Sequence, residues 1–96
     1  MTNEIKEREL ALAVLLEIEK GEKSHIVLRQ MLEKYQYLGK QERAFLTRVT
    51  EGTVERRIEL DYIIDQFSKV KTKKIKPVIR NILRLAVYQM KYMDNV

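Results

Sequence analysis

The fold is indicated most clearly by residues 51–67, EGTVERRIELDYIIDQF, which carry apolar side chains at three- and four-residue spacing. This spacing is typical of an amphipathic helix. Gly52 is unexpected there, because glycine costs about 1 kcal/mol relative to alanine inside a helix. Either the helix breaks near this point, or it continues and the glycine lets another helix approach closely. We predict a continuous helix from Lys40 or Gln41 to about Phe67, because one apolar stripe runs across the glycine.

The rest of the chain shows the same helical period, and nothing alternates at period two over a useful length. A first helix is expected over about residues 3–20, where Gly21 stops it. A second should begin after an N-cap at Ser24 and end near Gly39. A loop follows over residues 68–74, and Pro77 suits the start of a last helix over about residues 76–93. We therefore predict one all-α domain over residues 1–96, a small helical bundle of four or five helices.

The predicted core follows from these helices. The inner face of the helix over 40–67 should hold Phe45, Leu46, Val49, Thr53, Leu60, Ile63, Ile64 and Phe67. The last helix should pack through Ile79, Ile82, Leu83, Ala86, Tyr88, Met90 and Met93. A chain this short buries only about 60–65% of its unfolded surface, so a deep enzyme pocket is not expected.

Composition excludes several classes of chemistry. The chain has no cysteine, hence no disulfide, thiolate ligand or thiol nucleophile, and its single histidine, His25, does not favour a zinc site or a triad. The longest apolar run, residues 10–16, is far below the roughly 18 residues of a membrane span. Acidic residues precede that run, unlike the basic start of a signal peptide. We expect a soluble cytoplasmic protein without a membrane partner.

Charge is segregated along the chain. Residues 1–65 hold 11 Lys/Arg and 13 Asp/Glu, a net charge of −2, whereas residues 66–96 hold 8 Lys/Arg and only Asp94, a net charge of +7. Charge gathered in this way attracts phosphate more than a mixed surface of the same net charge. The alternative is a lysine-rich surface that serves solubility.

The basic segment has the residue types of a phosphate-binding surface. Five lysines crowd a loop that leads into a helix N-terminus, whose unpaired N–H groups favour anions. Arg80 and Arg84 lie four residues apart on one side of that helix. Together these could track an RNA backbone, with an affinity that falls as salt rises. The lysines are Lys69, Lys71, Lys73, Lys74 and Lys76.

Two adjacent arginines follow Gly52 by one turn. Arg57 lies four residues before Asp61, so a surface ion pair worth roughly 0.3–0.5 kcal/mol is expected. Arg56 has no acid four residues ahead, and we expect it to be partly free for phosphate. Among the tyrosines, only Tyr37 is expected to be exposed enough to stack on a base.

Four pieces then occur in a familiar order: Arg8 on the first helix, QERAFLTRVTEGTVERRIELD at residues 41–61, a lysine-rich loop, and IRNILRLAVYQMKYMD at residues 79–94. Over about residues 8–94 this order resembles the NusB/RsmB-type helical RNA-binding domain. The segments GTVERRIELD and LRLAVYQMKYMD are more similar to the N-terminal domain of the bacterial small-subunit rRNA cytosine-C5 methyltransferases (RsmB/Sun) than to the free-standing antitermination factors.

The resemblance implies roles for single residues. Gly52 and Thr53 match a small pair at a close helix crossing, and Asp61 and Gln89 match polar positions that stabilise the bundle. Arg84 matches either the basic surface or a buried, paired anchor. The predicted RNA-binding set is Arg8, Arg56, Arg57, Lys71, Lys73, Lys74, Lys76, Arg80 and Arg84.

The resemblance also implies a function. These 96 residues lack the cysteine and glycine-rich fold of a cytosine-C5 methyltransferase, so we expect a non-enzymatic, cofactor-free domain that binds ribosomal RNA. The parent enzyme would use S-adenosylmethionine elsewhere in its chain. An antitermination or protein-interaction module, or a fragment without independent activity, are the alternatives. A DNA-binding helix-turn-helix is not supported, because no short recognition helix follows Gly52.

In this family the domain continues beyond YQMKYMD with a proline-led turn and further helices. The resemblance therefore implies that the chain holds the first part of the domain, truncated before its last helices. We expect uncovered apolar surface and hence self-association or a protein partner.

Overall fold

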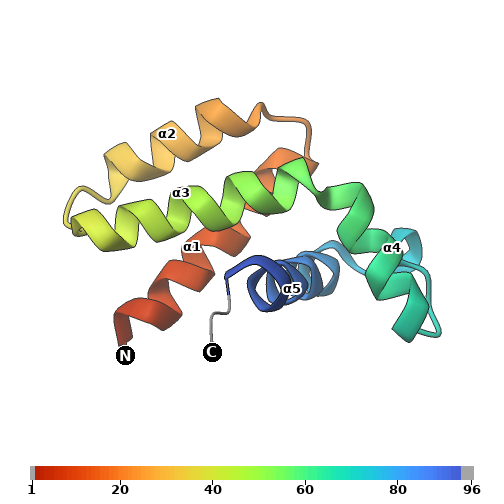
Figure 1. Ribbon diagram of the computed structural model, residues 1–96. Helices are drawn as coiled ribbons and strands as arrows, with labels where there is room; N and C mark the ends of the chain where they lie inside the picture. The colour runs from red at the N-terminus through yellow and green to blue at the C-terminus, as the bar shows by residue number, and fades with distance from the viewer. Residues whose placement is uncertain (1, 94–96) are drawn as a thin grey trace.

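The computed structural model describes residues 2–93, and side chains from Glu7 onward, as an all-helical fold (Figure 1). The α-helices are α1 (Thr2–Glu19), α2 (Ser24–Lys34), α3 (Lys40–Glu55), α4 (Arg57–Phe67) and α5 (Pro77–Tyr88). A 3₁₀ turn, η1 (Thr72–Lys74), precedes α5, and a π-helical turn, η2 (Gln89–Met93), follows it. No strand occurs within residues 2–93. The predicted all-α bundle is confirmed.

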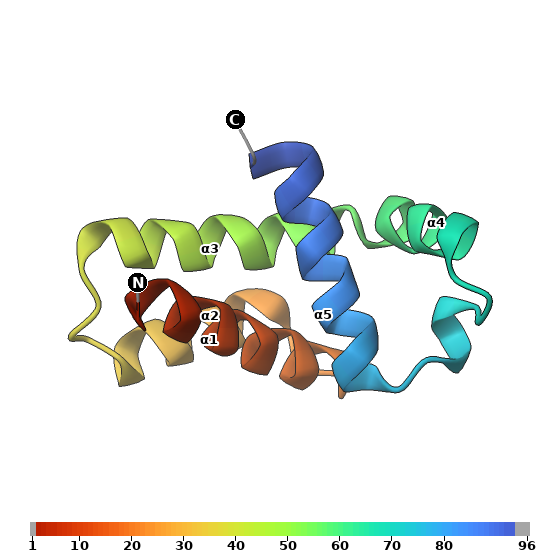
Figure 2. The ribbon, with the colours of Figure 1, turned by 90° about the horizontal axis from the view of Figure 1, so that it is seen from below.

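The helices form a bundle with an extension at one end. Helices α1, α2 and α3 pack on one another, and α5 crosses α1 and α3 (Figure 2). Helix α4 lies beyond the end of α3 and packs against α5. The bundle buries mainly aliphatic side chains, namely Leu10, Ala11, Val14, Leu15, Val27, Leu28, Leu46, Val49, Leu60, Ile64 and Leu85.

The predicted continuous helix over residues 40–67 is wrong, because the chain bends at Arg56 (Figure 1). Arg56 has φ −107° and ψ 21°, and its N–H still donates to the Gly52 carbonyl at 3.0 Å. The chain thus closes the last turn of α3 before it changes direction. The bend lets α4 pack against α5 and bury Leu60 and Ile64. Phe67, predicted in the core, lies at the C-terminal end of α4, beyond its buried residues Leu60 and Ile64, and is 86% exposed.

Gly52 marks a close helix crossing, as predicted. It is buried in α3 where α5 passes, and a Cβ at this position would overlap the phenol ring of Tyr88. The 0.8–1.0 kcal/mol lost by placing glycine in a helix is therefore offset by tight packing of α3 on α5. The helix break lies four residues further on and is a separate feature.

Two helix ends differ from expectation. Ser24 is the first residue of α2 rather than its N-cap; Lys23 takes the cap position without a side-chain hydrogen bond. The helix ends at Lys34, short of Gly39. Helix α1 agrees with its predicted bounds within one residue, and Gly21 beyond it has φ +110°.

The last helix begins at Pro77 as predicted and continues through η2 to Met93. Its packing face differs from the predicted one, because the buried residues are Asn81, Arg84, Leu85 and Tyr88. Leu83 is half-buried, and four residues predicted to pack are exposed: Ile79, Ile82, Ala86 and Met90.

Candidate nucleic-acid interface

The connection between α4 and α5 is held in place by its own polar side chains. The Thr72 N–H donates to Asp65 Oδ1 at 2.8 Å, and Thr72 is buried. Ser68 Oγ donates to the Val70 carbonyl at 2.7 Å and lies 3.1 Å from the Val70 N–H. These contacts fix the backbone from which the lysines project, so the lysines stand on an ordered turn.

All five lysines of this connection are exposed. Within residues 2–93, none of their side chains makes a hydrogen bond or an ion pair, because the acids nearby already have other partners. Their ammonium groups are therefore hydrated and available to an anion. We call this set the lysine turn; it comprises Lys69, Lys71, Lys73, Lys74 and Lys76.

Arg80, placed in the same predicted set, is instead engaged by the protein. Its Nη2 and Nε donate to the Glu19 carboxylate at 2.6 and 3.1 Å. Its Nη1 donates to the carbonyls of Thr72 and Ile75 at 3.0 and 2.6 Å. Arg80 thus ties the end of α1 to the start of α5 and holds the lysine turn.

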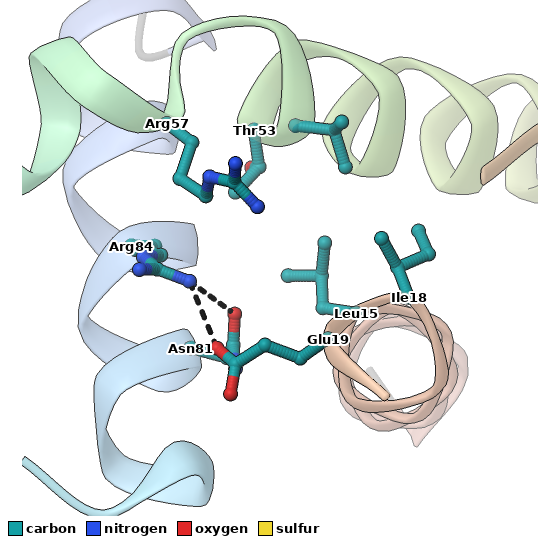
Figure 3. A pocket seen from close by; sticks show the side chains of 8 residues that line it. Leu15, Ile18, Glu19, Thr53, Arg57, Asn81 and Arg84 are labelled. Atoms are coloured by element: carbon teal, nitrogen blue, oxygen red, sulfur yellow. Dashed lines mark hydrogen bonds and ion pairs between the residues drawn. The ribbon is translucent and has the colours of Figure 1, made fainter. Parts of the chain in front are cut away.

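Arg84 is buried and paired, which agrees with the second of the two roles open for it. Its Nε and Nη2 donate to the two Asp61 oxygens at 2.7 and 2.8 Å, a bidentate pair. Its Nη1 donates to Glu19 Oε2 at 3.0 Å and to Asn81 Oδ1 at 3.2 Å (Figure 3). Asn81 Nδ2 also donates to Glu19 Oε2 at 3.0 Å. We call these five residues, Glu19, Asp61, Arg80, Asn81 and Arg84, the arginine cluster.

Glu19 is the centre of the arginine cluster, because its carboxylate accepts hydrogen bonds from Arg80, Asn81 and Arg84. These contacts lower its pKa. The hydrogen bond from Arg80 is the main cause that lowers the pKa of Glu19 from 4.5 to about 2, against the opposing effect of burial. Asn81 and the positive charge of Arg84 act in the same direction. The same pairing raises the pKa of Arg80. Glu19 is therefore ionised in the folded protein at neutral pH.

Arg56 and Arg57 have different surroundings although they are adjacent. Arg56, expected to be partly free, lies 4.4 Å from the centre of the Tyr92 ring and 3.5 Å from Glu59 Oε1, three residues ahead of it. Arg57 does not form the expected pair with Asp61, because Asp61 binds Arg84. The Arg57 guanidinium has no hydrogen bond or ion pair to any residue of the described chain.

Arg57 and Lys73, one residue of the lysine turn, meet at one open hollow. Arg57 extends from the bend between α3 and α4 to the side where Glu19 and Arg84 lie (Figure 3). Lys73 reaches the same hollow from η1. The hollow is lined by Glu19, Arg57, Asp61, Thr72, Lys73, Arg80 and Arg84.

Arg8 does not belong to this group. It is exposed on α1, about 16 Å of helix rise from Glu19. There it borders an apolar groove between α1 and α5, lined by Glu9, Leu12, Ile82, Leu85, Ala86 and Gln89. Of the predicted set, the structure therefore brings together Arg57, Lys73 and the two paired arginines at the hollow.

Two tyrosines are exposed enough to stack on a base. Tyr37 is 62% exposed, as expected, with its ring against the edge of Tyr35. Tyr62 on α4 is 67% exposed, and the sequence interpretation missed it. The sequence held no signal for this, because Ile58 and Tyr62 are four residues apart and such a pair is typical of a buried helix face, yet both are exposed.

The chain belongs to the NusB family. That family's model matches residues 5–96. The chain is 34% identical over 89 residues to the probable ribosomal RNA small subunit methyltransferase B of Bacillus subtilis, and 31% identical over 93 residues to that of Synechocystis. It is also 34% identical over 91 residues to the transcription antitermination protein NusB of Desulforamulus reducens. No solved structure matched the chain.

These alignments cover the chain and its relatives unequally. They include 93–96% of the chain, but only 20–21% of the two methyltransferases and 63% of the NusB protein. The chain is thus a NusB-type domain related to one region of long methyltransferases and to the larger part of an antitermination protein.

The described residues contain no group of three or more His, Cys, Asp or Glu side chains that could hold a metal ion. None of their helices is long and apolar enough to cross a membrane.

Proposed function

We propose that the chain is a non-catalytic RNA-binding domain that holds ribosomal RNA through the lysine turn. The observation that carries the proposal is that five exposed lysines lie on one ordered connection and none is neutralised by an acid within residues 2–93. Unpaired cations at such density favour a polyanion. Arg57 and, in the N-terminal half of α1, Arg8 are the further predicted contacts.

We also propose that the whole protein is an S-adenosylmethionine-dependent rRNA cytosine-C5 methyltransferase whose catalytic part lies outside these 96 residues. The support is the likeness to the two methyltransferases, about a fifth of whose length the chain spans. The chain itself contains no cysteine that could attack a cytosine. Loss of one 5-methylcytosine from small-subunit rRNA in a deletion strain, read by bisulfite sequencing, is the expected result; an unchanged methylation pattern would contradict it.

RNA binding is tested by fluorescence anisotropy with a labelled small-subunit rRNA hairpin, between about 50 and 200 mM salt. The test variant carries Lys69→Gln, Lys71→Gln and Lys74→Gln. The control carries Arg29→Gln, Lys34→Gln and Lys40→Gln, which removes the same charge near the turn between α2 and α3, at the opposite end from α4 (Figure 1). Lower affinity and a smaller salt slope in the test variant alone are expected. Equal affinities for the two variants would contradict the lysine turn as the RNA surface.

A protein-docking module is the second candidate, and the apolar groove between α1 and α5 favours it. Ile82 in this groove is 45% exposed, and Val78, Ile79 and Met90 on the same helix and turn are at least 46% exposed. Exposed apolar area of this kind commonly marks an interface. Ile82→Asn should weaken docking and leave RNA affinity unchanged, whereas the lysine-turn variant should do the reverse.

A further inference from the structure

We propose that the hollow between Arg57 and Lys73 binds a single phosphate group of an RNA strand, with these two side chains as its direct ligands. The inference rests on the proposed RNA-binding function and names the contact that positions the strand. The two residues are 16 positions apart in sequence, and the bend at Arg56 and the anchored turn η1 bring both to the hollow.

The other two arginines of the hollow are not its main ligands, because most of their donors already bind other groups of the protein. A guanidinium has five N–H donors. Arg84 makes four hydrogen bonds, to Asp61, Glu19 and Asn81. Arg80 also makes four, to Glu19 and two backbone carbonyls. Their role is to form a fixed floor.

The formal charges of that floor cancel. Arg80 and Arg84 supply two positive charges, and Glu19 and Asp61 supply two negative charges in direct contact with them. The carboxylates therefore do not repel an anion as they would if they were unpaired. Arg57 and Lys73 remain, with a charge of +2 facing the hollow. This suits a phosphodiester, with one negative charge, or a terminal phosphate, with up to two.

Both ligands project from backbone that is fixed. Arg57 is the first residue of α4, directly after the bend. Lys73 is the central residue of η1, whose preceding N–H, that of Thr72, is bound by Asp65 at 2.8 Å. A fixed backbone at both positions limits the conformational entropy lost on binding to that of the two side chains. Lys73 differs in this respect from the rest of the lysine turn, because it is the only lysine of the turn that lines the hollow.

The first experiment uses inorganic phosphate as the probe. Phosphate is titrated at constant ionic strength against chloride while ¹H–¹⁵N shifts are followed, including the Arg57 Nε–Hε signal and the Thr72 amide. Saturable shifts at these two positions are expected, and Lys73→Gln should abolish saturation. Linear shifts, or equal shifts around Arg29 and Lys40, would overturn the site.

The second experiment uses the labelled rRNA hairpin and the double variant Arg57→Gln/Lys73→Gln. Its affinity should fall about tenfold, the equivalent of one lost charge-assisted contact. Its salt slope should fall by about 0.7 to 0.9, the value for one phosphate contact. The charge-preserving double variant Arg57→Lys/Lys73→Arg should retain most of the slope, and Arg29→Gln/Lys40→Gln should retain all of it.

The two proposals fail in different ways. If Arg57→Gln/Lys73→Gln binds RNA like the unmodified chain while the lysine-turn variant does not, the hollow is overturned and RNA binding stands. If neither variant changes the affinity, the RNA-binding surface itself is wrong. Hairpins with a 5′-phosphate and a 5′-hydroxyl separate the two sources of phosphate: equal dependence on the hollow indicates an internal phosphodiester, and dependence with the 5′-phosphate alone indicates a strand end.

Discussion

The arginine cluster and the lysine turn are built from neighbouring cations of one basic segment, yet their surroundings are opposite. Arg80 and Arg84 meet Glu19 and Asp61, which come from α1 and α4. The lysines of residues 69–76 meet no carboxylate within the described chain. The difference shows that a basic segment of sequence indicates a ligand surface only where the fold brings no carboxylate side chain next to its cations. One group holds the helices together, and the other is left for a partner.

The sharpest way to break this comparison is Arg84→Ala. Removal of one member of a buried ion-pair group leaves carboxylates unpaired, which typically costs about 3–5 kcal/mol. We expect a loss of this size in urea unfolding followed by circular dichroism, because Arg84 is 7% exposed and serves both Asp61 and Glu19. Arg57→Ala is the control and should change stability by less than about 0.5 kcal/mol. Similar losses of unfolding free energy in the two variants would show that Arg84 contributes no more to stability than the unpaired Arg57.

Gly52→Ala tests the close crossing of α3 and α5. This crossing also positions the residues of the arginine cluster that lie on α5. The new methyl group would overlap the Tyr88 ring, and overpacking of this kind costs about 1–3 kcal/mol. This should exceed the roughly 1 kcal/mol that alanine gains in a helix. Thermal unfolding of the single variant and of Gly52→Ala/Tyr88→Leu measures the effect. The second change should recover part of the loss, and a stabilised Gly52→Ala would contradict the close approach.

The pH dependence of stability separates the cluster from the turn, because only the cluster contains a carboxylate that titrates against arginines. The pKa of Glu19 is lowered in the folded state, so its contribution is fully present above about pH 4.5 and is lost as the pH falls toward about 2. The difference in unfolding free energy between the unmodified chain and Glu19→Gln should therefore shrink over this range. It should remain constant from pH 5 to 8. A difference independent of pH down to pH 2 would show that Glu19 contributes through shape rather than charge.

Helix periodicity was enough to predict the all-α fold, whereas the close crossing at Gly52 was one of two alternatives until the family resemblance favoured it. The period of the apolar stripe did not reveal the bend, because Leu60 and Ile64 fit a continuous helix and a broken one equally well. The position of the cluster was also hidden. Glu19 lies 61 residues before Arg80, and no local pattern links the two. The exposed lysines were predictable because they follow one another without an acid between them.

The smallest expected effect concerns the stability of the lysine turn. Like charges on one short connection repel one another, so Lys71→Gln/Lys74→Gln should leave stability unchanged or raise it by up to about 0.5 kcal/mol. Any gain should be largest at low salt, where screening is weakest. Urea unfolding at two salt concentrations measures this, with Arg29→Gln/Lys40→Gln as the control of equal charge. A loss of unfolding free energy above about 1 kcal/mol would mean that these lysines have partners that stabilise the fold. The lysine turn and the arginine cluster would then differ only in how much they stabilise the protein.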